Sequence, residues 1–130
     1  MWLAGLFCVS ASSMADTISA REHYVMHCQG CHGANGKGLA GVVPGFGAEL
    51  AQIMQTSGGR EYLVRVPGVS MAPITDAQLA QVLNWMVDRY LPGLTPTYPA
   101  FTEQEISDLR HPPMDRPLVI RQQLLAQENK

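Results

Sequence analysis

Residues 27–33 read HCQGCHG, placing two cysteines two residues apart with a histidine directly after the second. Three kinds of site use such a Cys-x-x-Cys pair: a structural zinc site, a dithiol redox site and a site of covalent haem attachment. Structural zinc usually takes four Cys or His ligands. The sequence contains no second Cys-x-x-Cys pair, and His111 is the only histidine after His32. The pattern therefore disfavours zinc.

A dithiol redox pair normally follows a strand and opens a helix within a β–α–β unit. No segment of this sequence shows convincing strand alternation. The remaining chemistry is haem attachment, for which Cys-x-x-Cys-His is the known attachment sequence. Two thioethers, from Cys28 and Cys31, would fix neighbouring edges of the porphyrin, and the adjoining turn would carry the His32 ring under the iron. A bare motif of this kind also occurs by chance, so the elements around it have to support it.

Three helix starts fit the capping box, in which the cap residue and the third residue after it satisfy free backbone N–H groups. They begin at Ser19, Thr75 and Thr102, each followed three residues later by Glu or Gln. The first predicts a helix running towards the cysteines. The second predicts the clearest helix, to residue 90, because apolar residues recur there at helical spacing until Pro92-Gly93.

Two further helices are expected at 48–56, stopped by Gly58-Gly59, and at 61–66. Between the helices lie Gly- and Pro-rich loops, GANGKGLAGVVPGFG and VPGVSMAP. The fold class is therefore predicted to be all-α with long loops. Such long loops are unusual in a compact domain, unless they wrap a large buried ligand.

The length of 130 residues suits one domain, and the net charge of −2 offers no basic patch for nucleic acid. Residues 1–15 are apolar and then small, which predicts the end of a secretory signal, shortened by a late start codon, with cleavage before Asp16. A disordered terminus is the alternative, and Phe7 disfavours a lipoprotein anchor at Cys8. The apolar run is too short for a membrane span, so none is expected in the mature chain.

The region from about Ser19 to Tyr90 resembles a class I c-type cytochrome domain. The resemblance rests on the attachment motif, on the Gly-rich loop 35–38 and on Tyr24, four residues before Cys28. It also rests on small Ala20, one turn earlier, and on the pair Val82 and Trp85, which would meet the first helix. It implies the cytochrome c-like fold over residues 16–91, with one covalent haem c and with 92–130 as a Pro-rich, partly helical extension.

The same resemblance implies the iron ligands. His32 matches the proximal ligand, and Pro44 matches the proline whose carbonyl accepts the histidine N–H. Met71, in the loop ahead of the last core helix, matches the distal methionine, although Ala72 separates it from Pro73 where the family often has Met-Pro. Met86, Met54 and Met26 are expected to have structural roles, and His23 and His27 are expected on the surface of the first helix.

A six-coordinate iron leaves no open position for substrate, so we expect no enzyme activity but a soluble, exported (periplasmic) carrier of single electrons. Its partners would be a periplasmic redox protein such as a dehydrogenase, and an oxidase or other acceptor. Docking would use the apolar residues Val42, Val43, Phe46 and Val69, unless these only line the haem pocket.

Two alternatives stay open. The chain could be a fixed cytochrome subunit of a periplasmic dehydrogenase complex, clasping its partner with the tail from Leu91. It could also be a haem ligand sensor or minor peroxidase, if Met71 does not bind iron. Six apolar tail residues are too many for a solvated segment and should pack on the domain or on a partner: Ile106, Leu109, Leu118, Ile120, Leu124 and Leu125.

Overall fold

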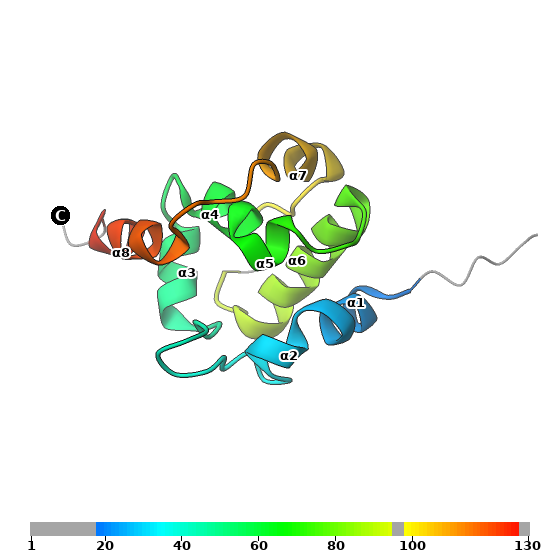
Figure 1. Ribbon diagram of the computed structural model, residues 1–130, viewed down its shortest axis with the longest axis horizontal. Helices are drawn as coiled ribbons and strands as arrows, with labels where there is room; N and C mark the ends of the chain where they lie inside the picture. Colours follow the sequence, from blue (N-terminus) through cyan, green and yellow to red (C-terminus); the bar gives the residue numbers. More distant parts are fainter. Residues whose placement is uncertain (1–17, 95–97, 128–130) are drawn as a thin grey trace, which may run out of the picture.

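Eight helices and no strand form the part of the chain described by the computed structural model, residues 18–94 and 98–127 (Figure 1). They are α1 (Ala20–His27), α2 (Gln29–His32), α3 (Ala48–Met54), α4 (Gly59–Arg65), α5 (Pro67–Ser70), α6 (Asp76–Tyr90), α7 (Glu103–Leu109) and α8 (Pro117–Gln127). In these residues the one β-type pairing is an isolated antiparallel bridge between Leu39 and Val43. The prediction of an all-α fold is confirmed.

Two of the three expected capping boxes are complete. Ser19 and Thr75 each accept a hydrogen bond from the backbone of the third residue, whose side chain bonds back to the cap. At α7 only half of the box forms: Thr102 accepts from the Glu105 backbone at 3.1 Å. The Glu105 carboxylate instead pairs with Arg60, at 2.5 Å. A charged partner on α4 outcompetes a neutral backbone N–H for this carboxylate.

The helix bounds differ from expectation around Gly59, which begins α4 where the sequence predicted only a stop. A Cβ at this position would lie 2.0 Å from the Ile53 carbonyl oxygen, so glycine lets α4 start directly against the end of α3. The short helices α2 and α5 were not expected. In α5, Pro67 stands at the first turn, where its missing N–H costs nothing.

The first and last core helices, α1 and α6, pack against each other through aromatic rings. The Tyr24 ring lies 5.1 Å from that of Trp85 and 5.6 Å from that of Tyr90, centroid to centroid. The Tyr24 hydroxyl donates a hydrogen bond to the Gly33 carbonyl oxygen at 2.7 Å. The predicted contact of Tyr24 with Trp85 is confirmed, and it ties the α1–α6 pair to the end of α2.

The C-terminal segment packs on the rest of its own chain. Helix α7 lies against α6, and α8 lies against α3 and α4 (Figure 1). Phe101 and Ile106 belong to the main hydrophobic core, and Leu124 joins a second core cluster with Ile53 and Tyr62. Leu109, Ile120 and Leu125 are partly buried, while Leu118 remains exposed. Of the two possibilities left open for the tail, the structure supports packing on the domain.

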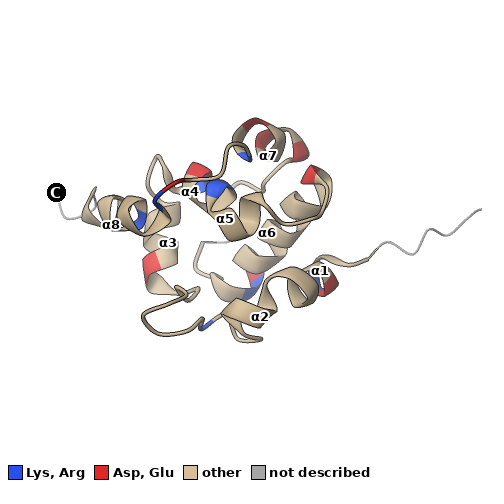
Figure 2. Cartoon of the chain, in the orientation of Figure 1, with Lys and Arg blue, Asp and Glu red and all other residues tan. Residues whose placement is uncertain are grey.

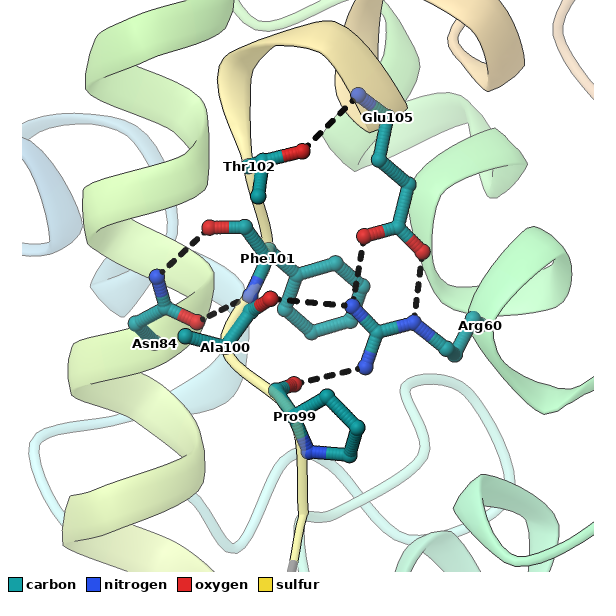
Figure 3. A network of polar contacts seen from close by, with 7 residues as sticks. All are labelled: Arg60, Asn84, Pro99, Ala100, Phe101, Thr102 and Glu105. Carbon is teal, nitrogen blue, oxygen red and sulfur yellow. Dashed lines mark hydrogen bonds and ion pairs between the residues drawn. The ribbon is translucent and has the colours of Figure 1, made fainter.

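A polar network around Arg60 fastens the start of this segment to α4 and α6 (Figure 3). The Arg60 guanidinium pairs with both oxygens of Glu105 at 2.5 Å and donates to the Pro99 carbonyl at 2.8 Å. It also lies over the Phe101 ring, 4.0 Å from its centroid. Asn84 of α6 makes two hydrogen bonds to the Phe101 backbone, at 2.7 and 3.0 Å. Charge, ring and backbone contacts therefore all hold the segment in place.

The expected signal segment, residues 1–15, lies outside the described residues, so its cleavage stays a prediction. Among the helices that the structure describes, none is both long and apolar enough to cross a membrane.

Replacing Ile106 by alanine should destabilise the protein by about 2–5 kcal/mol, because the side chain is 0% exposed and its loss leaves a cavity. Chemical denaturation of the haem-loaded protein measures the change. Val119→Ala is the control on the same C-terminal segment: its side chain is 41% exposed, and the expected change is within about 0.5 kcal/mol. Equal, small effects of both substitutions would show that the segment contributes no stability.

Candidate haem site

The turn between α1 and α2 brings the motif residues together. Helix α1 ends at His27, and the Cys28 carbonyl accepts hydrogen bonds from the backbone N–H groups of Cys31 (3.2 Å) and His32 (3.0 Å). Gly33, with a φ of +75°, ends α2 in a conformation that glycine adopts without strain. This one short helical turn places Cys28, Cys31 and His32 on the wall of a single cavity.

That cavity has a volume of about 430 Å³, and its wall is mostly apolar. Several parts of the chain contribute: the α1–α2 turn, the loop 42–46, α3, α4, the segment 66–74, α6 and α8. Besides the motif residues, its lining includes Tyr24, His27, Val42, Val43, Pro44, Phe46, Leu50, Tyr62, Leu63, Val66, Gly68, Val69, Ala72, Ile74, Leu79, Val82, Leu83, Met86, Pro117, Leu118 and Arg121. An apolar cavity with a few polar groups is the usual form of a cofactor site.

The loop after α2 is folded back on itself, so that it presents its far end to His32. Leu39 and Val43 exchange two backbone hydrogen bonds, at 3.0 and 2.8 Å. Gly38 has a φ of +68°, and a Cβ there would lie 2.3 Å from the Val43 carbonyl oxygen. Phe46 then stacks on the His32 ring, with a centroid distance of 4.4 Å. The loop therefore encloses one side of the cavity.

Pro44, the expected acceptor for the His32 N–H, lies on the same cavity wall as His32. Burial lowers the pKa of His32, and the nearby Pro44 backbone has the smaller effect of raising this pKa. The buried Nδ1 of His32 makes no hydrogen bond that satisfies distance and angle. The structure thus places Pro44 beside His32, and the bond between them stays a prediction.

The two cysteines of the motif form no disulfide, and Cys28 is partly buried whereas Cys31 is exposed. Burial raises the pKa of the Cys28 thiol, and neighbouring Cys31 raises it further. Dithiol redox sites lower the pKa of their attacking cysteine, so this environment does not resemble theirs. Within residues 18–94 and 98–127, no group of three or more His, Cys, Asp or Glu side chains could hold a metal ion.

The two candidate methionines lie in different surroundings. Met71 follows α5 and stands between Val69 and Ala72, which line the cavity, but its own side chain is 69% exposed and does not. Met86 lies on the buried face of α6, is 3% exposed and does line the cavity. The expected packing of Met86 is confirmed, whereas iron ligation by Met71 stays a prediction.

His23 is not a surface residue. It is 3% exposed, and neither ring nitrogen has a hydrogen-bond partner. His27, which is exposed as expected, lies near it, with ring centroids 5.9 Å apart, and lines the cavity. The prediction for His23 was wrong because α1 buries the face that carries it and Tyr24.

Arg121 of α8 is the residue that the sequence analysis missed. Its side chain lines the cavity, is 10% exposed and pairs with Glu49 of α3 at 2.7 Å. Among the described residues, it is the one Arg or Lys on the cavity wall. A sequence pattern could not identify it, since 89 positions separate it from His32 and only the docking of α8 brings it there.

The comparisons with known proteins agree with this geometry. No protein-family model matches the chain. The chain is 32% identical over 126 aligned positions to cytochrome c-552 of Thermus thermophilus, covering 79% of this chain and 89% of the relative. It is equally similar to a longer cytochrome c-552 from one particular strain of Thermus thermophilus, of which it covers 79%. The chain therefore belongs to the c-type cytochromes.

Proposed function

We propose that the protein is a class I monohaem cytochrome c that carries single electrons. The observation that supports this most strongly is the placement of Cys28, Cys31 and His32 on the wall of one apolar cavity. Haem has a large apolar face, and it bonds covalently to thiols at one edge. The cavity offers both kinds of contact, so the residues present fit the cofactor.

In this proposal Cys28 and Cys31 form the two thioethers and His32 binds the iron. Bound haem supplies a one-electron couple whose potential depends on its axial ligands and on burial. The chain's own residues hold the ring and exclude water. Phe46 and the α6 residues Val82 and Leu83 surround it with apolar surface, which limits the reorganisation that electron transfer requires.

Met71 is the proposed sixth ligand, and a long unbranched side chain such as methionine can turn towards the cavity that its neighbours line. A thioether sulfur favours ferrous iron and raises the reduction potential. With Met71 bound, no position on the iron remains for a substrate.

The cavity mouth suggests how partners dock. Val42 and Leu118 line the cavity and are also exposed. Lys37 is the one Lys, Arg, Asp or Glu between Cys28 and Ala48, so the loop around Val42 carries little charge (Figure 2). Docking would therefore depend on apolar contact with a redox protein, such as an exported dehydrogenase or a terminal acceptor, more than on electrostatic steering.

One observation favours a second candidate function, a haem ligand sensor or minor peroxidase. Because the Met71 side chain is largely exposed, an iron without that ligand would keep an open position. The other alternative, a fixed dehydrogenase subunit whose tail clasps a partner, has less support, since α7 and α8 pack on their own domain.

Expression with a cytochrome maturation system should yield a chain whose intact mass exceeds the polypeptide by a single haem, because the chain contains one Cys-x-x-Cys-His. Mass spectrometry measures this, and it also locates processing, which we expect near Asp16. Cys28→Ala/Cys31→Ala should abolish covalent attachment. Extraction of the wild-type haem into acidified organic solvent would refute the proposal.

Met71→Ala should open the iron while leaving the thioethers and His32 in place. The variant should lose the long-wavelength methionine–ferric iron band and bind cyanide readily. Its reduction potential should fall on the order of 0.2 V, or about 5 kcal/mol for one electron.

Met86→Leu is the matched control, a volume-conserving change that should cost under about 1.5 kcal/mol and leave the spectrum unchanged. If Met86→Leu loses the methionine–ferric iron band and Met71→Ala keeps it, Met86 is the ligand. If neither variant changes the spectrum, the iron is not bound by either methionine and the sensor or peroxidase function gains support.

Arg121 is proposed to interact with the carboxylates of the haem propionates. In Arg121→Gln, loss of the nearby positive charge should raise the propionate pKa by about 1–3 units. The pH-dependent part of the reduction-potential curve should then move to higher pH. Glu49→Gln removes a negative charge and keeps the guanidinium, so its curve should not move to higher pH. Identical curves for wild type and Arg121→Gln would contradict the role.

A further inference from the structure

Arg110, at the C-terminal end of α7, is buried and bonds to one short segment of the chain. Its Nε donates to the Ser70 carbonyl at 2.8 Å, one Nη donates to the Ile74 carbonyl at 2.8 Å, and the other donates to the Ala72 carbonyl. The guanidinium also pairs with Asp76 at 2.8 Å. In return, the buried Ser70 hydroxyl donates to the Arg110 carbonyl.

The segment that Arg110 holds is also a wall of the haem cavity. Val69, Ala72 and Ile74 line the cavity together with His32. Met71 lies between two residues, Ser70 and Ala72, whose carbonyls are both bonded to Arg110. One guanidinium, from 40 residues further along the chain, therefore bonds the backbone on either side of Met71 and adds to the local turn hydrogen bonds there.

Only arginine can make this set of contacts, because its planar group presents five donors in a rigid fork. A lysine could pair with Asp76 but could not reach three alternate carbonyls at once. Without Arg110, the Ser70 carbonyl would lose its charged donor in a buried place, where an unpaired polar group is costly. The Ala72 carbonyl would keep only the bond from the Ile74 N–H. The segment would then move to find other partners or water.

We propose that Arg110 is a positioning residue for the sixth iron ligand. It fixes the backbone of 70–74 so that the Met71 sulfur stays bound to the iron. The C-terminal segment thereby controls the coordination of the haem as well as the stability of the fold. This inference rests on the proposed function, in which Met71 is that ligand.

A second arginine provides a matched control for the effect of docking alone. Arg60 also joins the C-terminal segment to the core, through Glu105, two backbone carbonyls and the Phe101 ring (Figure 3). None of these contacts involves residues 66–76. Arg60→Gln therefore weakens the attachment of α7 while leaving the carbonyls around Met71 bonded to Arg110.

The experiment compares haem-loaded wild type, Arg110→Gln, Arg110→Lys and Arg60→Gln. The readouts are the methionine–ferric iron band and the equilibrium constant for cyanide. We expect Arg110→Gln to weaken the band and to raise cyanide affinity about tenfold or more, within the range by which one site influences another. Arg110→Lys should have a smaller effect in the same direction and is the variant to use if Arg110→Gln does not fold.

Arg60→Gln should lower the melting temperature but leave the band and the cyanide affinity near the wild-type values. If Arg110→Gln and Arg110→Lys both retain the wild-type band and cyanide affinity, the positioning role is refuted and Met71 ligation stands. If Arg60→Gln changes both readouts as much as Arg110→Gln, docking of the segment as a whole controls ligation, and the role of Arg110 is also refuted. Absence of the band from the wild type would refute Met71 ligation itself, and the positioning role with it.

Discussion

An apolar cavity lined by most of the helices and by the loops between them is the constraint on which the rest of the structure depends. Its wall includes residues of α1, α2, α4, α6 and α8 and of the loops between them. Helices that face such a cavity cannot bury all of their apolar surface against one another. Long loops are therefore acceptable here, because they complete the wall around a ligand-sized space instead of packing on each other.

The chain meets this constraint with contacts that fix separate parts of the wall. The aromatic contact between α1 and α6, through Tyr24 and Trp85, anchors the helix that carries the cysteine turn. The C-terminal segment acts in the same way at two points. Arg60 of α4 pairs with Glu105 of this segment. Arg110, which belongs to the segment, bonds to the backbone around Met71. A buried arginine is well suited to this work, since one rigid group satisfies several carbonyls at once.

This arrangement connects stability with function. In a c-type cytochrome, the properties of the iron depend on its axial ligands and on how closely the protein holds them. In the wall segment 68–74, Val69 and Ile74 pack against the main core, whereas Met71 is exposed. Local turn hydrogen bonds shape this segment, and Arg110 adds bonds from a distant part of the chain. The C-terminal segment is therefore part of the site and not an appendage to it.

The sequence alone determined the local features: the Cys28–His32 turn, the helix starts at Ser19 and Thr75, and the all-α class. Each of these depends on residues within a few positions of one another, so spacing and capping chemistry were sufficient. The tertiary structure decided the burial of His23, the start of α4 at Gly59, and the arrival of Arg110 and Arg121 beside the cavity wall. Those outcomes depend on which distant segments pack together, and no local pattern of residue types carries that information.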